Sequence, residues 1–304
     1  MAPVRRFVRR VPWEVWAALT LIVLDGVAVI ATYSRFPTTL LYNVQHSDTV
    51  SAGFGRELVA LNFPFALVGI ALVGLAWPRL HGALRAAGVV SIALCAVVYF
   101  AVDQTDLDPK PLNAVPALGL TVAVALVLAV GVPAARQVRG DRVRIGIAAV
   151  LVFFCAPLIA AELGFFLDGV PFLGWFYETG RLTTQPGVEG LHYAVHHGQH
   201  HGWQATMLSL TALGFSRLPR PRILDAYLAL MLAYGVGNLV NDDWLEQVVK
   251  RGWTNHEVPS LLTPAANWGW PAVLVGAGAV WWLWFRQPSR TTSEETSAAI
   301  SSSA

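Results

Sequence analysis

The stretch LVALNFPFALVGIALVGLAW, residues 58–77, runs for twenty positions without a charged side chain. A helix rises about 1.5 Å per residue, so this stretch is long enough to cross a hydrocarbon core of about 30 Å. Its only amide side chain is Asn62, and the remaining residues are almost all apolar. The stretch therefore predicts a helix that spans a membrane.

The composition of the whole chain agrees with this prediction. The 304 residues are 55% hydrophobic and only 13% charged, whereas charged residues make up about a quarter of an ordinary soluble domain. The net charge of +2 gives no basis for a nucleic-acid partner. Cys95 and Cys155 both fall in apolar runs, which predicts small buried side chains and not a disulfide. We expect an all-α, polytopic integral membrane protein of the cell membrane, surrounded by lipids.

Eight apolar segments of spanning length can be distinguished along the chain. They are 13–33, 57–77, 83–102, 114–134, 145–167, 190–215, 223–240 and 267–285. The first follows four arginines, as a signal peptide would, but it is too long for a signal core and lacks a small-residue cleavage site. We therefore expect a single eight-helix domain over 1–286. The segment 287–304 is rich in Ser, Thr, Glu and Ala, which predicts a disordered tail.

The positive charges predict how these segments are oriented. If the N-terminus is cytoplasmic, 15 of the 21 Lys and Arg residues fall on the cytoplasmic side and 6 on the outer side. This bias is the one that the positive-inside rule requires. Leaving out segment 190–215 would destroy the alternation after residue 190. The sequence thus predicts eight spans, with the N- and C-termini and the tail in the cytoplasm.

Segment 190–215 is unusual because it carries five of the eight histidines of the chain. If the segment is helical throughout, His192, His196 and His200 form one narrow stripe at positions i, i+4 and i+8. His197 and His201 flank this stripe. Side chains at i and i+4 lie above one another, so their imidazoles can converge on one metal ion. The stripe would begin at the outer surface and descend about half a bilayer.

Carboxylates in other segments are expected at the same depth. Glu162 lies near the outer end of segment 145–167, and Asp242 follows Tyr234 and Asn238 at helical spacing on the next-to-last span. Asp25 interrupts the outer half of the first span. An ionisable residue inside a membrane is costly, so it normally faces a partner or a wet cavity. Glu162 and Asp242 are therefore candidate ligands or general bases.

Three interpretations of the histidines remain open on sequence alone: metal ligands, a proton relay or pH sensor without metal, and a solvated or packing face. Metal binding is favoured because five histidines with matched carboxylates exceed any structural need. The candidate ligands are His192, His196, His197, His200, His201, Glu162 and Asp242. Without a nearby cysteine, these ligands suit zinc, copper or non-haem iron.

The spacings His192-x-x-x-His196 and His197-x-x-His200-His201 resemble the first two histidine boxes of membrane fatty-acid desaturases and hydroxylases, which hold a di-iron centre. The two boxes overlap here, there is no third box, and the predicted site faces the outer side, whereas that family's site faces the cytosol. We do not assign the chain to that family on about ten residues.

Two functions from different classes follow from the sequence. The first is a membrane metalloenzyme acting on an apolar or lipid-like substrate. Oxidation is slightly favoured over hydrolysis because catalytic zinc usually has three protein ligands. The second is a transporter of metal ions or protons, or another metal-handling protein, which requires polar residues through the inner half of the bundle. The inner halves are mainly Ala, Val and Leu, and this asymmetry favours the enzyme.

Overall fold

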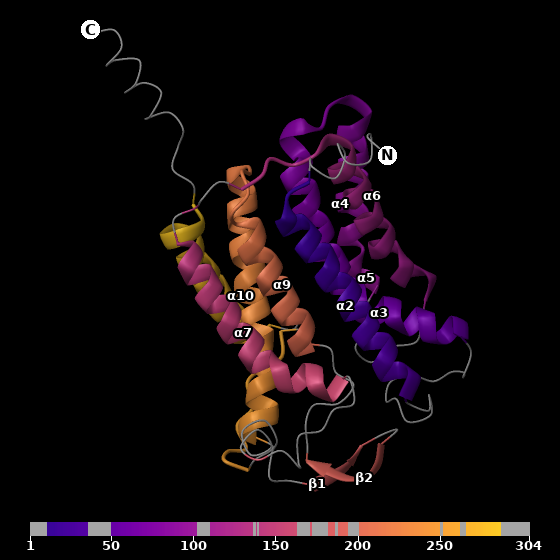
Figure 1. Cartoon of the computed structure of the whole chain (residues 1–304), viewed down its shortest axis with the longest axis vertical. Coiled ribbons are helices and arrows are strands. Elements are labelled where there is room, and N and C mark those ends of the chain that lie inside the picture. Colours follow the sequence, from indigo (N-terminus) through magenta and orange to yellow (C-terminus); the bar gives the residue numbers. More distant parts are fainter. Residues whose placement is uncertain are drawn as a thin grey trace.

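A computed structural model describes residues 11–35, 50–101, 110–135, 138, 140–162, 171, 182–185, 188–193, 201–249, 252–261 and 266–286. Within these residues the protein is a bundle of long, roughly parallel and antiparallel helices with one short β-hairpin at one end (Figure 1). The long helices and the hairpin strands have the following bounds. They are α2 (Trp13–Arg35), α3 (Val50–Ala76), α4 (Gly82–Ala96), α6 (Val115–Val130), α7 (Asp141–Glu162), β1 (Leu182–Gln185), β2 (Val188–Tyr193), α9 (His201–Phe215), α10 (Arg222–Trp244) and α11 (Gly269–Val280).

Short helical segments extend several of these elements. The four-residue helix α5 (Val98–Ala101) continues α4, a 3₁₀ turn (Pro111–Ala114) precedes α6, and a π-helical turn (Trp281–Phe285) continues α11. A 3₁₀ turn (Trp77–Arg79) likewise continues α3, and a π-helical turn (Leu245–Val249) continues α10. A helix therefore occurs in each of the eight apolar segments identified in the sequence.

Five of these helical stretches are long and apolar enough to cross a membrane. They are Trp13–Ile30, Leu58–Arg79, Gly82–Phe100, Pro111–Val130 and Arg222–Trp244.

The distribution of side chains is that of a membrane-embedded protein. Large apolar residues lie on the outer surface of the bundle, among them Val23, Ile145 and Leu283, which are 64%, 69% and 81% exposed. A soluble monomer rarely exposes so much apolar surface. Polar side chains are instead buried between helices, as Asp25 and Asn62 are. Cys95 and Cys155 are both buried, as the sequence predicts.

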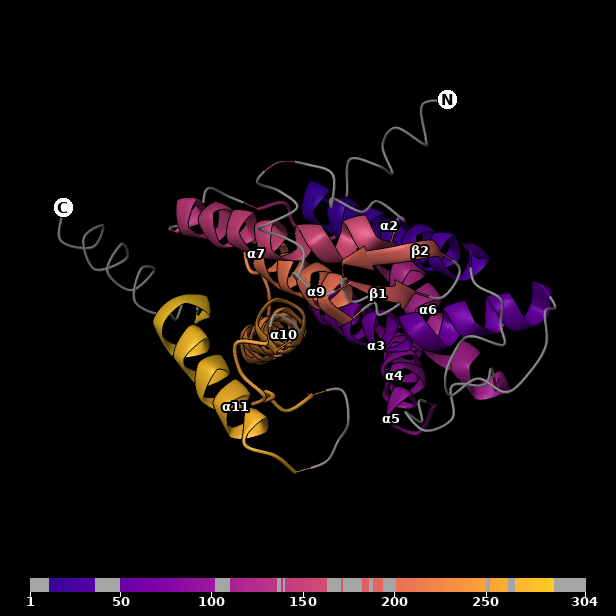
Figure 2. The ribbon, with the colours of Figure 1, turned by 90° about the horizontal axis from the view of Figure 1, so that it is seen from below.

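Helix α9 lies at the centre of the bundle. It packs most extensively on α10 and also contacts α2, α3 and α7 (Figure 2). Every residue from Gly202 to Ser209 is buried. Because α9 faces other helices and not lipid, it can carry Gln204, Thr206 and Ser209. The low hydropathy of this segment therefore has a second cause besides its histidines.

A proline in α3 explains one of the contacts that hold α9 in place. Pro64 has no N–H, so the carbonyl of Ala60, four residues earlier, loses its helical hydrogen bond. The side-chain amide of Gln204 on α9 donates to this carbonyl at 2.9 Å. In a membrane a freed backbone group must find a protein partner, because no lipid can supply one. The proline and the glutamine thus join α3 to α9.

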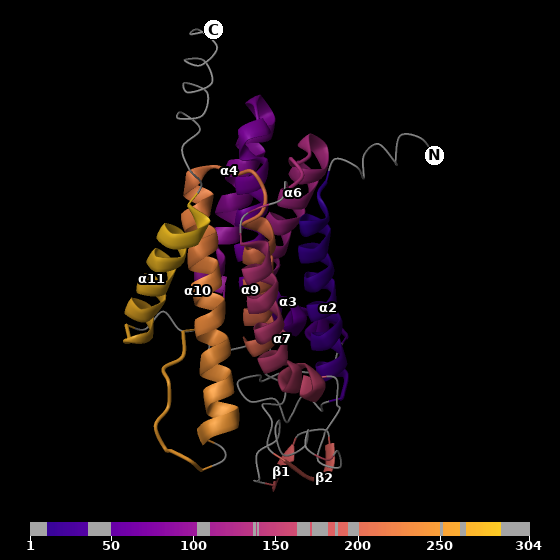
Figure 3. The ribbon, with the colours of Figure 1, turned by 60° about the vertical axis from the view of Figure 1, so that its left-hand side comes forward.

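Different elements meet at the two ends of the bundle (Figure 3). At one end, the arginine end, the starts of α2 and α7 meet the turn 216–221 between α9 and α10 and the end of the last helix. At the other, the histidine end, the end of α7, the hairpin and the start of α9 lie together, beside the end of α10. The directions of the elements therefore bring His192, His201, Glu162 and Asp242, the candidate metal ligands that the structure describes, to one end and a set of arginines to the other.

We predict that Gly235→Ala separates α9 from α10 and destabilises the protein. A Cβ at Gly235 would meet Ser209 Oγ and would lie 2.6 Å from the backbone oxygen of Ala205. Overpacking of this kind costs about 1–3 kcal/mol. The measurement is the unfolding free energy in mixed detergent micelles, with Gly276→Ala as the matched control, since a Cβ there lies 3.8 Å from Ala233 Cβ. Equal stability of the two variants would contradict the prediction.

Candidate functional site

The histidine stretch joins the hairpin to α9 and does not form one continuous helix. His192 lies on β2, where it is the antiparallel partner of Thr183, and His201 is the first residue of α9. The predicted helix over 190–215 is therefore wrong in its first part. Pro186 and Gly187, which separate the strands in the sequence, are residues typical of a turn, and this signal argues against a continuous helix before the histidines. His196, His197 and His200 lie outside the described residues.

This placement changes how the histidines can converge. Because His192 lies on a strand, it cannot share the face of one continuous helix with the later histidines, as the predicted stripe requires. A strand carries His192 to the histidine end, and a helix leaves that end at His201. His196, His197 and His200 follow the strand and precede the helix in the sequence.

The carboxylates predicted for this site reach the same end of the bundle. Glu162 is the last residue of α7, and Asp242 lies in the last turn of α10, where it is 2% exposed. Helix α7 contacts both α9 and α10. The positions of Glu162 and His201 follow from the helices to which they belong. Among the described residues, no group of three or more His, Cys, Asp or Glu side chains lies close enough to hold a metal ion.

Other polar residues near the end of α10 have structural partners. Asn241 donates from Nδ2 to the carbonyl of Val258 at 2.6 Å, and Trp244 donates from Nε1 to the carbonyl of His256 at 2.7 Å. These bonds fasten segment 252–261 along α10. Asn238 donates to Tyr234 O on its own helix at 3.0 Å. The candidate ligand on α10 is thus Asp242, while its neighbours organise the adjoining segment.

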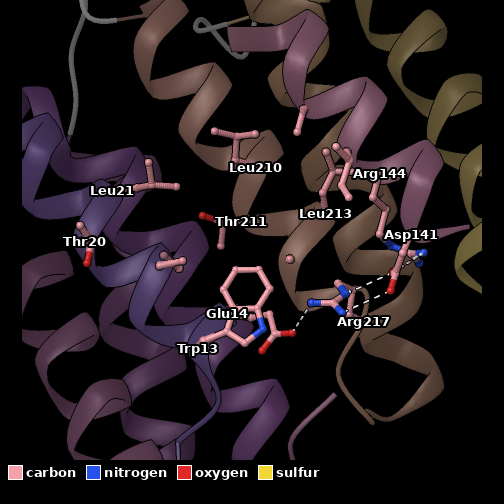
Figure 4. Close-up of a pocket in the computed structure, with 15 residues that line it drawn as sticks. Trp13, Glu14, Thr20, Leu21, Asp141, Arg144, Leu210, Thr211, Leu213 and Arg217 are labelled. Atoms are coloured by element: carbon pink, nitrogen blue, oxygen red, sulfur yellow. Dashed lines mark hydrogen bonds and ion pairs between the residues drawn. The ribbon is translucent and has the colours of Figure 1, made fainter. Parts of the chain in front are cut away.

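Sequence reasoning missed an ion-pair network at the arginine end. Arg217, in the turn after α9, binds Glu14 Oε1 through Nη1 at 2.6 Å. It also donates to both carboxylate oxygens of Asp141, each at 3.2 Å, through Nε and Nη2 (Figure 4). Charge-assisted bidentate pairs of this kind are strong and directional. One guanidinium therefore joins the starts of α2 and α7 to the end of α9.

Two more arginines extend this network. Arg144 donates to Ser216 Oγ at 2.8 Å and lies over the ring of Trp284, 4.7 Å from its centroid. Arg220 and Asp225 form an ion pair at 2.6 Å, with both side chains only 1% exposed. Arg220 also donates to the carbonyls of Leu218 and Phe285, at 2.9 and 3.1 Å. Arginine side chains thus hold α2, α7, α9, α10 and the last helix together at this end.

Burial and pairing shift the pKa values of these groups in ways that fit their roles. Desolvation lowers the pKa of Arg220 to about 10 against the opposing effect of Asp225, so the guanidinium stays charged near neutrality. Desolvation acts to raise the pKa of Asp141, but the hydrogen bond and charge of Arg217 outweigh it. The pKa of Asp141 therefore lies below its ordinary value of 3.8. Both groups keep their charges, and the network remains ionic.

The sequence signal for this network was present but not decisive. Glu14 is the second residue of an apolar helix, and Asp141 lies among the arginines between two spans. Counting positive charges for orientation does not indicate which acid pairs with which arginine.

Comparison with protein-family models, with curated proteins and with solved structures finds no match for this chain. The site must therefore be interpreted from its own residues.

We predict that Asp225→Asn destabilises the protein far more than Asp141→Asn. The first change leaves the buried guanidinium of Arg220 without its counter-charge, which costs about 3–5 kcal/mol. The second removes a carboxylate that is 26% exposed, while Arg217 keeps Glu14, so the loss is about 1 kcal/mol or less. Unfolding free energies in mixed micelles measure both. A smaller loss for Asp225→Asn than for Asp141→Asn would contradict the prediction.

We also predict that the stabilisation supplied by Asp141 depends on pH. A carboxyl with a lowered folded-state pKa stabilises the fold above its unfolded value of 3.8, and this contribution disappears as the pH falls through the lower folded value. The difference in stability between wild type and Asp141→Asn should therefore be present at neutral pH and should vanish in acid. Thermal unfolding over a pH series measures it. A constant difference throughout would refute the assignment.

Proposed function

We propose that this protein is a membrane-embedded metalloenzyme whose metal site lies at the histidine end and acts on an apolar or lipid-like substrate. One observation carries the proposal. Five histidines fall within ten residues of sequence that run from β2 to the first residue of α9, and both elements lie at the end of the bundle where α7 finishes at Glu162 and α10 buries Asp242. Histidine and carboxylate side chains are common ligands of metal ions, and a buried ionisable residue inside a membrane normally has a partner.

The proposed ligands come from a strand, a connection and a helix. His192 and His201 flank the site, while His196, His197 and His200 supply its central imidazoles. Glu162 and Asp242 serve as further ligands, as general bases or as acceptors that orient an imidazole from behind. Imidazole and carboxylate ligands suit zinc, copper or iron. Zinc would supply a hydroxide near neutral pH for hydrolysis, whereas iron or copper would support oxidation of the substrate by oxygen.

The environment of the site supports an apolar substrate. The bundle exposes large apolar side chains around its outside, so a lipid-like molecule can reach either end by moving within the bilayer. We propose that the eight helical segments all span the cell membrane with the arginine end in the cytoplasm. The bias of basic residues toward that side supports this orientation. The metal site would then open toward the outer leaflet.

The interior of the bundle supports an enzyme over a transporter. Between the two ends the core is filled by large apolar side chains that are at most 1% exposed, including Leu72, Leu75, Met207 and Leu228. At the arginine end, Arg220 pairs with Asp225 and Arg217 pairs with Glu14. An ion would have to pass a dry core and then a set of paired charges, which is unfavourable. A pocket open on one side fits this distribution better.

The proposal predicts that purified protein contains bound metal in near-stoichiometric amount and that His196→Ala and His200→Ala lose it. Elemental mass spectrometry measures the content, on protein purified without a histidine tag. His81→Ala, which alters an exposed histidine at the opposite end, is the matched control and should retain the metal. Asp242→Asn should weaken binding about 10- to 100-fold if this carboxylate ligates or orients a ligand.

The outcomes separate the alternatives. Zinc favours hydrolysis, and iron or copper favours oxidation. Wild-type protein without bound metal, or variants that retain it fully, would contradict the proposal. Metal uptake into sealed vesicles that depends on the same histidines would instead favour a transporter.

A further inference from the structure

We propose that the protein has a second binding site, at the arginine end, for a neutral single-chain amphiphile whose hydroxyl head binds Glu14 and Thr211. The site is a cavity of about 650 Å³ between α2, α7 and α9. This volume is within the range of about 300–1,000 Å³ that is usual for small-molecule sites. The inference is independent of the proposed metal site, which lies at the opposite end of the bundle.

The cavity is built from one face of each helix (Figure 4). Glu14, Ala17, Ala18 and Leu21 recur at helical spacing on α2, so they lie on the same face. Small residues and the absence of a side chain at Gly214 on α9 leave space between the helices. The cavity extends about 10 Å along α2, as the rise from residue 14 to residue 21 requires. Its lining is almost entirely apolar, which suits a hydrocarbon chain.

Two buried polar atoms facing this cavity have no hydrogen-bond partner among the described residues. They are Oε2 of Glu14 and Oγ1 of Thr211, on side chains that belong to residues each 2% exposed. Figure 4 shows the Thr211 hydroxyl pointing from α9 toward α2, with Glu14 nearer the arginine end. A buried polar atom without a partner is costly, whereas a ligand that bonds to it recovers the loss. The two atoms mark where a polar head belongs.

The charges around the cavity select a neutral head with a hydrogen-bond donor. The carboxylates of Glu14 and Asp141 are balanced by two guanidiniums, because Arg217 pairs with both acids and Arg144 lies 3.6 Å from Asp141. Adding a full positive or negative charge would unbalance this network in a poorly hydrated place. Oε2 of Glu14 can only accept, while a hydroxyl of the ligand can donate to it and accept from Thr211. A long-chain alcohol meets all these requirements.

The cavity is also accessible from the bilayer. Trp13 on α2 and Ile145 on α7 line it, yet they are 63% and 69% exposed at the outside of the bundle. An amphiphile could therefore enter sideways between α2 and α7. Trp13 additionally lies against Arg217, 5.3 Å from the ring centroid to the guanidinium carbon. This is the position expected of an aromatic residue at the membrane interface.

The test is photocrosslinking of the full-length protein with four probes that share one dodecyl chain and its terminal diazirine. The probes are the alcohol, the ammonium, the sulfate and the plain hydrocarbon. We expect saturable labelling of α2 and α9 by the alcohol, mapped by peptide mass spectrometry. Ala17→Phe, which fills the cavity, should abolish it. Thr211→Val should weaken it about 2- to 10-fold, the effect of losing one hydrogen bond.

The matched control is Thr206→Val. Thr206 is likewise a buried threonine of α9 without a hydrogen-bond partner for its hydroxyl among the described residues, but it does not line the cavity. This variant should bind the alcohol as wild type does. Preference for the ammonium or the sulfate, equal labelling by the hydrocarbon, or equal effects of the two threonine variants would overturn the assignment. Metal content is not expected to change in any of these variants. A failure of the amphiphile proposal can therefore be distinguished from a failure of the metal-site proposal.

Discussion

The structure depends on one constraint: inside a bilayer, a polar group must be satisfied by the protein itself. Pro64 shows how the constraint produces tertiary structure. It frees the carbonyl of Ala60, and Gln204 on the central helix α9 donates to that carbonyl. A feature that would weaken a helix in water here becomes a specific contact between two helices that are far apart in sequence. The burial of Asp25, Asn62 and Asp242, all at most 2% exposed, follows the same rule. These polar residues are placed between helices, within a core that is otherwise mainly apolar, while further apolar residues face outward.

The same constraint gives the two ends of the bundle different properties. At the arginine end every described arginine of the network is joined to acids, carbonyls or aromatic rings, and this joins α2, α7, α9, α10 and the last helix. The histidine end instead carries Asp242 and the other residues that we propose as metal ligands. The ion-pair network and the proposed chemistry are therefore separated along the long axis of the bundle. An apolar core between them isolates one from the other, so variants at one end need not disturb the other.

Much of the fold could be predicted from the sequence because hydropathy acts locally. The apolar segments and their order emerge from composition alone, and a helix lies within each. The hairpin was missed because the histidine spacing suggested a helix. The turn signal of Pro186 and Gly187 lies just before the histidines in the sequence and was not used. The arginine network could not be predicted, since Arg217 lies 203 residues from Glu14 and 76 from Asp141. Such pairs depend on how helices pack, which local patterns do not specify. The cavity was missed for the same reason, because three helices have to meet before it exists.

The hydrogen bond from Arg220 to the carbonyl of Phe285 has a consequence for biogenesis. These residues are 65 positions apart, so at a synthesis rate of about 5–20 residues per second Arg220 leaves the ribosome roughly 3–13 s before its acceptor. During that interval Asp225, only five residues further on, is already available to neutralise it. The nascent chain can therefore shield this arginine locally while the translocon still holds the final segment. Once Phe285 has been synthesised, its carbonyl completes the set of acceptors of Arg220 and binds the last helix to the helices already formed.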